Sequence, residues 1–189
     1  LFRSISSVGS ALDCVVRPEM TIGPYFVDDQ LNRSDIRSDP LEGIVSEGIP
    51  LTLKVNVFEA ANNSCTPLEG AQVDVWHCDA LGVYSGVSDP TFNTVGQQFL
   101  RGYQLADANG GVQFQTIYPG WYPGRTVHIH FTIRTKAAND QDYQFTSQFF
   151  FDETLTDQVH AQEPYASKGQ RNTRNTDDNI YNNGGDQLL

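Results

Sequence analysis

The sequence predicts an all-β fold, and within that class a β-sandwich with long loops between its strands. Three observations support this fold class. Segments in which apolar and polar residues alternate recur through the middle of the chain, as in half-buried strands. Stretches rich in glycine, proline and aspartate separate these segments. Only one short segment has the spacing of a helix, so helices cannot form a layer of their own.

The alternating segments are the predicted strands, and side chains of one parity in each would face a shared core. In chain order they are residues 51–57, 72–77, 99–105, 112–117, 127–135 and 143–151. The tight turn at 107–111 predicts that the strands on either side of it pair as a β-hairpin. Three consecutive phenylalanines, 149–151, predict a last strand that is buried on both faces. Residues 154–162 are expected to form one short helix that ends before Pro164.

A chain of 189 residues suits one domain, which can bury a core of its own. Residues 1–50 are rich in turn formers, and we expect them to lie on the domain as an ordered, loop-rich segment. Residues 51–165 carry the strands of the predicted sandwich. Residues 166–189 are polar, and we expect them to form a C-terminal segment of the same domain.

The chain is strongly acidic, with 23 Asp and Glu against 12 Lys and Arg and a formal net charge of −11. Such a surface repels phosphate and anionic lipid, so we expect neither nucleic acid nor a membrane as partner. No apolar run is long enough for a transmembrane helix. The single methionine is Met20, so Leu1 is not a natural translation start, and either a leader has been removed or the sequence has been trimmed. Together with the cysteine usage and the acidic balance, a removed leader predicts a secreted protein.

The three cysteines, Cys14, Cys65 and Cys78, form no CxxC pair, which argues against a structural zinc site. One disulfide and one free thiol can be arranged in three ways. A strand over 72–77 would hold Cys78 about 15–20 Å from the loop that carries Cys65, because the strand rise is ~3.3 Å per residue. This distance disfavours a Cys65–Cys78 pair and leaves Cys14 as a candidate partner. The alternative is three reduced, partly buried cysteines.

Two histidines that are two residues apart give the first indication of a functional site. His128 and His130 lie in the predicted strand 127–135, where alternate residues share a face, so both imidazoles would point the same way. Ile129 and Phe131 would point the other way, into the core. Two imidazoles on one polar face suit two neighbouring positions on one metal ion.

The loop before these histidines, residues 118–125, is shaped by prolines and glycines and carries Tyr122 and Arg125. If tyrosines complete the metal site, their phenolate oxygens are hard anionic donors that favour a trivalent ion such as Fe(III) over Zn(II) or Cu(I). Two phenolates and a hydroxide would also neutralise Fe(III), which a buried pocket tolerates.

These motifs resemble those of the intradiol ring-cleavage dioxygenases, a family that includes catechol 1,2-dioxygenases and protocatechuate 3,4-dioxygenases. The resemblance extends from about Thr21 to Asp152. The parts that carry it are residues 21–25, 75–84, 99–111 and 118–130, and Gln148. Its most specific element is the order Tyr, Tyr, His-x-His with an arginine three residues before the first histidine.

The resemblance implies a β-sandwich whose long loops carry a non-heme Fe(III) site. Tyr84 matches the equatorial tyrosinate ligand of that family and Tyr122 the axial one. His128 and His130 match its two imidazole ligands. The short spacing between Tyr122 and His128 predicts an open site that accepts bulkier catechols.

The resemblance also implies catalytic and substrate-binding residues. Arg125 matches the active-site arginine, which would stabilise the negative charge that develops on the substrate ring. Gln148 matches a glutamine beside the substrate. Tyr122 is the expected leaving ligand, and once it is displaced either Tyr122 or the hydroxide can accept a catechol proton as a general base. Tyr25 and Trp121 are expected to line the substrate pocket.

The implied reaction uses a small catechol and O2 as partners. Both oxygen atoms enter the substrate, and the C–C bond between the two hydroxylated carbons breaks to give a cis,cis-muconate. The iron would act as a Lewis acid and as a template for the substrate.

Two other functions remain open on the sequence. A β-sandwich module can bind a ligand without turnover, but it would need no set of two tyrosines and two histidines. A zinc-dependent hydrolase built on His128 and His130 would need a further histidine or carboxylate near the strand, for which Asp79 is a candidate. The metal content of the protein separates these alternatives.

Overall fold

A computed structural model gives the architecture, and it describes residues 17–61, 64–136 and 140–189. Two antiparallel sheets form the body of this part of the chain. One sheet pairs β1 (Pro50–Asn56) with β8 (Gly111–Ile117), and the other has the strand order β10-β9-β4-β7. The strands of the larger sheet are β4 (Gln72–Trp76), β7 (Arg101–Leu105), β9 (His128–Lys136) and β10 (Asp142–Phe150).

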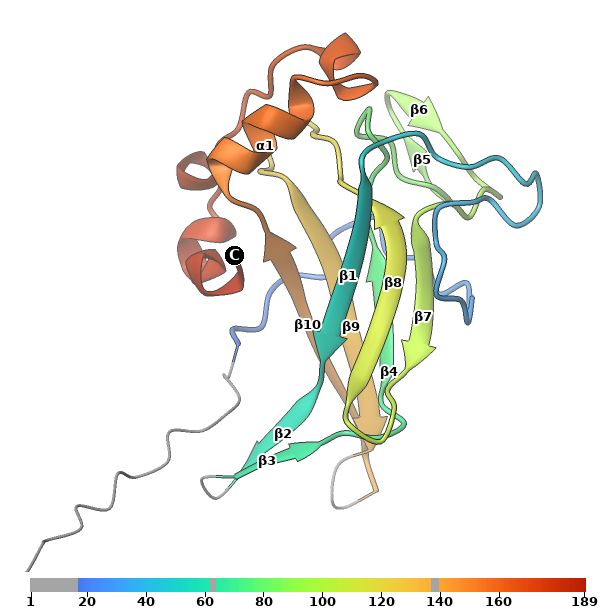
Figure 1. Cartoon of the computed structure of the whole chain (residues 1–189), viewed down its shortest axis with the longest axis vertical. Coiled ribbons are helices and arrows are strands. Elements are labelled where there is room, and N and C mark those ends of the chain that lie inside the picture. Colours follow the sequence, from blue (N-terminus) through green and yellow to red (C-terminus); the bar gives the residue numbers. More distant parts are fainter. Residues whose placement is uncertain (1–16, 62–63, 137–139) are drawn as a thin grey trace, which may run out of the picture.

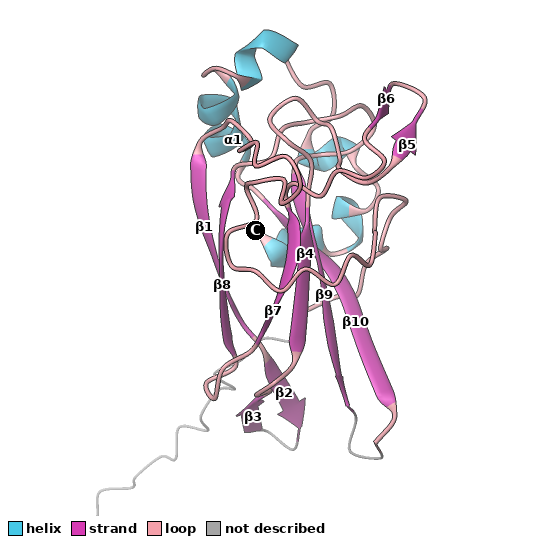
Figure 2. Cartoon of the chain, turned by 90° about the vertical axis from the view of Figure 1, so that its right-hand side faces the viewer, coloured by secondary structure: helices cyan, strands magenta, loops and turns pink. Residues whose placement is uncertain are grey.

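The two sheets face each other as the layers of a sandwich, which confirms the predicted fold class (Figures 1 and 2). Figure 2 shows the β1–β8 pair on one side and the four-stranded sheet on the other. Two smaller hairpins lie at opposite ends of the sandwich (Figure 1). They are β2 (Phe58–Ala61) with β3 (Ser64–Pro67), and β5 (Ser88–Asp89) with β6 (Phe92–Asn93).

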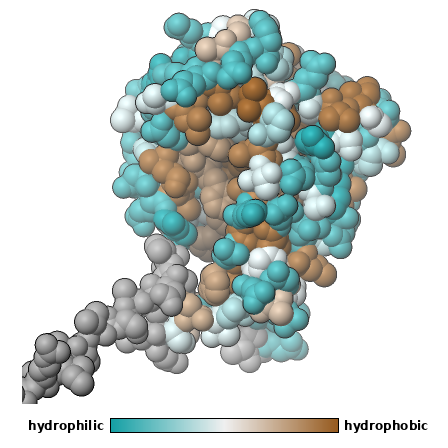
Figure 3. All heavy atoms as spheres, in the orientation of Figure 1, coloured by the Kyte–Doolittle hydropathy of each residue, from teal (hydrophilic) through white to brown (hydrophobic). Residues whose placement is uncertain are grey.

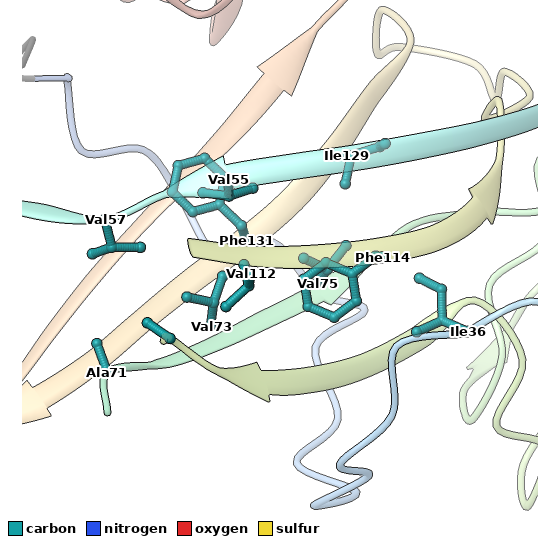
Figure 4. Packing of buried hydrophobic residues seen from close by; sticks show 11 residues of the cluster. Ile36, Val55, Val57, Ala71, Val73, Val75, Val112, Phe114, Ile129 and Phe131 are labelled. Carbon is teal, nitrogen blue, oxygen red and sulfur yellow. The ribbon is translucent and has the colours of Figure 1, made fainter. Parts of the chain in front are cut away.

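The hydrophobic core lies between the two layers and is built by alternate residues of facing strands (Figure 4). Phe114 on β8 and Ile129 on β9 are fully buried in it. Burial of one such side chain stabilises the fold by roughly 1.5–3 kcal/mol relative to an exposed position. The other buried members are Ile36, Val55, Val57, Ala71, Val73, Val75, Ala106, Val112 and Phe131.

All six predicted strands are present, but the predicted hairpin is wrong. The turn at 107–111 is as tight as expected, since Asp107 N–H donates to the Gly111 carbonyl at 3.0 Å. However, β7 before the turn pairs with β4, and β8 after it pairs with β1. The turn therefore connects the two layers of the sandwich. Alternation shows that both strands have one buried face, but it does not show whether they pair or face each other across the core.

The N-terminal part of the described chain closes one edge of the sandwich as an ordered loop. Residues 31–36 run between β7 and β8, with bridges from Asn32 to Tyr103 and from Asp35 to Gln115. Ile36 is fully buried in the core. This loop thus connects the two layers by backbone hydrogen bonds.

The C-terminal segment is helical in short pieces. The predicted helix is present as α1 (Glu153–His160), and Asp152 caps it by accepting the Leu155 N–H. Four 3-10 helices follow: η1 (Tyr165–Lys168), η2 (Asn175–Asp177), η3 (Tyr181–Asn183) and η4 (Gly185–Leu188). Leu188 packs against Met20 and Phe150, so this segment covers the end of β10. No helix within the described residues is long and apolar enough to span a membrane.

Apolar side chains gather in a hollow at the centre of the face that carries β1 and β8, and hydrophilic side chains surround them (Figure 3). The two-stranded layer is narrower than the four-stranded layer, so it covers β10 only in part. Phe145 and Phe149 on β10 are accordingly half-buried, and Phe149 stacks on Phe131 at a centroid distance of 4.3 Å. Phe149 and Phe150 belong to different clusters, as the prediction of burial on both faces requires.

The cysteines resolve one of the open alternatives. Cys65 is disulfide-bonded, whereas Cys78 is a buried free thiol. A Cys65–Cys78 pair and a fully reduced chain are therefore both excluded. Cys14 lies outside the described residues.

Candidate metal centre

The strand β9 begins with the two histidines, and both imidazoles are buried on the same face of the sheet. His128 is 2% exposed and His130 1% exposed. Ile129 and Phe131 point into the core on the opposite face (Figure 4). The Nε2 atoms of the two histidines lie 3.0 Å apart. The alternation of the strand thus places two nitrogen donors side by side.

Each imidazole is held in place by a different contact. Nδ1 of His128 lies 2.6 Å from the carbonyl oxygen of Thr126, which accepts the Nδ1–H and leaves the Nε2 lone pair free for the site. The His130 ring stacks on Trp76 with a centroid distance of 4.9 Å. Burial lowers the pKa of His128 to about 3 and that of His130 well below its usual value. Both rings are therefore neutral, as metal binding requires.

Tyr84 approaches the histidines from the loop after β4. Its side chain is fully buried, and its hydroxyl has no hydrogen-bond partner among the described residues. The Asp79 carboxylate shapes this loop by accepting the N–H groups of Leu81 at 2.9 Å and Val83 at 2.8 Å. The ring centroids of Tyr84 and His130 lie 6.3 Å apart. A buried hydroxyl without a partner is costly, so an oxygen in this position suits a metal ion.

Tyr122 reaches the same place from the loop between β8 and β9. Its hydroxyl lies 3.2 Å from Nε2 of His128. Its ring meets the Tyr84 ring edge-on at a centroid distance of 5.7 Å. Two oxygen and two nitrogen donors from three segments of the chain therefore converge, and they belong to the four residues that the family resemblance implies as ligands.

The two tyrosine-bearing loops touch backbone to backbone, and glycines permit this approach. Gly120 N–H donates to the Asp79 carbonyl at 3.0 Å, and a Cβ on Gly120 would overlap the Ala80 carbonyl oxygen. A Cβ on Gly82 would overlap the Trp121 carbonyl oxygen, and the Gly82 φ of +80° also favours glycine. Each glycine stands two residues before its tyrosine, so this contact fixes the position of one tyrosine relative to the other.

The donor set fits a hard trivalent cation such as Fe(III). Burial raises the pKa of Tyr84 and of Tyr122 well above the usual phenol value. Both phenols would thus stay protonated on their own, and a strongly charged ion is needed to hold them as tyrosinates. Within the described residues, no three His, Cys, Asp or Glu side chains gather at one point. The carboxylate that a zinc hydrolase would need is therefore not at the histidine pair there.

Arg125 and Gln148 lie beside the four donors. Gln148 stands opposite His130 in the β9–β10 register and is fully buried. Its amide nitrogen donates to the Thr21 carbonyl at 2.9 Å, which leaves Oε1 to accept from Nη2 of Arg125 at 2.5 Å. Nη1 of Arg125 lies 3.5 Å from Nε2 of His128. The guanidinium charge is thus next to the centre.

The two predicted pocket residues lie in different surroundings. Tyr25 stacks on Tyr84 with a centroid distance of 4.5 Å and an interplanar angle of 22°. Trp121 instead faces the C-terminal segment, where its Nε1–H donates to the Gly169 carbonyl at 3.1 Å and Lys168 Nζ lies 4.9 Å from the ring centroid. The structure therefore brings Tyr25, but not Trp121, into the aromatic cluster around Tyr84.

Sequence reasoning missed Asp178, which contacts the site from the C-terminal segment. Its Oδ2 accepts the Nε–H of Arg125 at 2.8 Å and the backbone N–H of Thr126 at 2.9 Å. In the sequence it is one of many polar residues in an asparagine-rich segment, and no spacing relates it to Arg125. Only the three-dimensional arrangement identifies it.

The amino-acid sequence is similar to those of known dioxygenases. Residues 21–173 match a protein-family model described as Dioxygenase. A catechol 1,2-dioxygenase from Candida albicans is 32% identical over 106 residues, which make up 54% of this chain and 31% of that protein. The match thus spans about a third of the length of this curated relative.

The fold is similar to solved structures over most of its length. An intradiol ring-cleavage dioxygenase from Tetranychus urticae superimposes with a TM-score of 0.79 and 34% identity, covering 93% of this chain and 84% of that one. The dioxygenase domain of a dioxygenase–carbohydrate-binding fusion from Streptomyces sp. SirexAA-E superimposes with a TM-score of 0.56 and 31% identity, covering 87% and 81%.

Proposed function

Since the chain belongs to the intradiol ring-cleavage dioxygenase family, we propose that it is a non-heme Fe(III) oxidoreductase that cleaves catechols with O2. Both oxygen atoms enter the substrate, the bond between the two hydroxylated carbons breaks, and a cis,cis-muconate is formed. The observation that carries the proposal is the convergence of a buried tyrosine, a half-buried tyrosine and two neutral histidines at one point. A ligand-binding module has no use for such a set.

Tyr84, Tyr122, His128 and His130 would hold the iron. When bound, the iron would supply Lewis-acid chemistry that holds the deprotonated catechol and makes its ring reactive towards O2. Tyr84 is fully buried on a loop that Asp79 braces, so it is the tyrosine suited to remain in place. Tyr122 is less buried and lies on a separate loop. It is therefore the tyrosine suited to move aside and to accept a proton from a catechol hydroxyl at its Oη.

Arg125 would stabilise the negative charge that develops on the substrate ring. Its guanidinium lies beside His128, and Gln148 fixes one of its two terminal nitrogens. A charge that is held in place before the reaction needs no reorganisation during it, which is the basis of electrostatic stabilisation.

A visible spectrum of the purified protein, with the iron measured in the same sample, tests this function. We expect about one iron per chain and a red-to-purple tyrosinate charge-transfer band, because the site holds one hard trivalent ion. Catechol added without O2 should shift this band to longer wavelength, and admission of O2 should consume one O2 per catechol. A protein that stays colourless after iron loading would refute the proposal. Iron with colour but without a shift would refute catechol as the substrate.

Secretion is also proposed, and the disulfide at Cys65 supports it. Disulfides persist in oxidising compartments such as the extracellular space and are rare in the cytosol. The acidic composition, with a formal net charge of −11, agrees with an exported protein.

Alkylation of the cysteines tests the redox state on which the secretion proposal depends. In denatured protein without reductant, we expect Cys78 to be labelled, because it is a reduced thiol that is protected only by burial. Cys65 should be labelled only after reduction. Peptide mass spectrometry reads both outcomes, and labelling of Cys65 without reductant would remove the support for secretion.

A further inference from the structure

We propose that Asp178 is a positioning residue for catalysis, because it holds the Arg125 guanidinium beside the metal centre. The inference rests on the proposed function, in which Arg125 stabilises charge on the substrate. Asp178 lies beyond residue 173, where the family match ends, so the family likeness does not assign it a role.

The contacts of Arg125 show how its orientation is set. Nε–H donates to Asp178 at 2.8 Å, and Nη2–H donates to Gln148 at 2.5 Å. Nη1 lies 3.5 Å from Nε2 of His128, one of the proposed metal ligands. Two anchored nitrogens fix the plane of a guanidinium, since its donors form a rigid fork. Nη1 is thereby directed towards the centre.

Asp178 is itself rigidly held. Its carboxylate is 1% exposed, and both oxygens are in use. Oδ2 accepts from Arg125 and from the Thr126 N–H, and Oδ1 accepts the N–H groups of Ile180 at 2.7 Å and Tyr181 at 3.3 Å. Burial opposes ionisation, but the hydrogen bonds from Thr126 and Arg125 hold the pKa of Asp178 below its usual value. The bond to Arg125 is therefore a charge-assisted one.

The loop that carries Arg125 has other attachments to the C-terminal segment. Gly124 N–H donates to Thr173 Oγ1 at 3.1 Å, and the Thr126 hydroxyl donates to Asn175 Oδ1 at 2.6 Å. These bonds remain when Asp178 is altered. The orientation of the guanidinium can therefore be disturbed without release of the loop.

The substitution Asp178→Asn is suited to this purpose. An asparagine has the same shape but only one acceptor oxygen, whereas four N–H donors face the two oxygens of Asp178. One orientation of the amide places its NH2 against the Arg125 Nε–H. The other places the NH2 against the Ile180 N–H, which pushes the side chain away, and leaves Arg125 a neutral acceptor in place of the charge-assisted bond. The neighbouring substitution Asp177→Asn is the matched control. The Asp177 side chain is exposed, and among the described residues it accepts only the Arg174 N–H, at 3.0 Å.

Asp178→Asn is expected to lower kcat/KM for a catechol by about 10- to 100-fold, the usual effect of misplacing a supporting group near a reactive site. The iron content and the tyrosinate band should stay unchanged, because none of the four proposed ligands hydrogen-bonds to Asp178. Asp177→Asn should retain the full kcat/KM. In an Arg125→Ala background, Asp178→Asn should cause no further loss, because its effect passes through Arg125.

Crystal structures of the purified wild type and the Asp178→Asn protein supply a readout that does not depend on turnover. We expect the guanidinium to turn away from Gln148 while the four ligand side chains stay in place, and an unmoved guanidinium would overturn the proposal. An unchanged kcat/KM, an additional loss in the Arg125→Ala background, or loss of iron would also overturn it. If Asp178→Asn does not fold, Asp178→Glu, which keeps both acceptors on a longer side chain, takes its place with the same expectations. A wild type without colour or O2 uptake would refute the proposed function alone, and the crystal structures would still decide whether Asp178 positions Arg125.

Discussion

Replacing His128 with alanine is expected to abolish iron binding and to lower turnover of a catechol by more than about 100-fold. Loss of a residue that only supports a metal ligand costs up to about 100-fold, and loss of the ligand itself should cost more. His128 is central to the site, because its Nε2 lies 3.0 Å from the Nε2 of His130 and 3.2 Å from the Tyr122 hydroxyl. The remaining donors would leave one side of the ion open. Iron analysis and the charge-transfer band measure the loss directly.

A second buried histidine provides the control for this substitution. His77 is 1% exposed, its Nδ1 lies 2.8 Å from the Cys78 carbonyl, and its Nε2 lies 2.6 Å from the Thr116 hydroxyl. Both nitrogens thus have protein partners and no capacity for a metal. His77→Gln is expected to lower stability while the iron and its colour remain. Retention of a full iron complement in His128→Ala would contradict the proposed ligand set.

The strands and the two histidine donors were predictable because both depend on local periodicity, whereas Tyr84 and Tyr122 were assigned from the resemblance to a family. Because side chains alternate along β9, Ile129 faces the core, whereas His128 and His130 share the opposite face. The same rule identified β1, β4, β8 and β10. The expectation that Gln148 lies at the site came from the resemblance to a family, and the β9–β10 register places Gln148 opposite His130.

The features that were missed depend on contacts between segments far apart in the sequence. The hairpin prediction failed because the turn at 107–111 joins strands of different sheets, and a buried face is compatible with either arrangement. Asp178 was missed because 53 residues separate it from Arg125. Trp121 was expected at the pocket because it adjoins Tyr122, but adjacent residues of an extended loop point in different directions.

Gly82→Ala is expected to disrupt the site severely, although Gly82 is not one of the proposed ligands. The Gly82 backbone lies against the Trp121 carbonyl where the two tyrosine-bearing loops touch, and an added Cβ would overlap that oxygen. Because the obstacle is backbone, one loop must move, which costs about 1–3 kcal/mol or more by analogy with overpacked cores. The movement would separate Tyr84 from Tyr122. We therefore expect weak iron binding, a lost or altered charge-transfer band and a turnover at least about 100-fold lower, as for displacement of a reacting group by about 1 Å.

Gly70→Ala separates this steric effect from backbone strain. Gly70 has a φ of +77°, nearly the same as the +80° of Gly82, but nothing lies within 4 Å of an added Cβ. An alanine there costs only the strain of the left-handed conformation, about 1–2 kcal/mol. Denaturant unfolding should therefore show destabilisation in both variants, whereas iron binding should fail only in Gly82→Ala. Equal iron binding by the two variants would mean that the loop contact does not set the distance between Tyr84 and Tyr122. The position of Tyr84 would then depend on the packing of its ring against Tyr25 and Trp76.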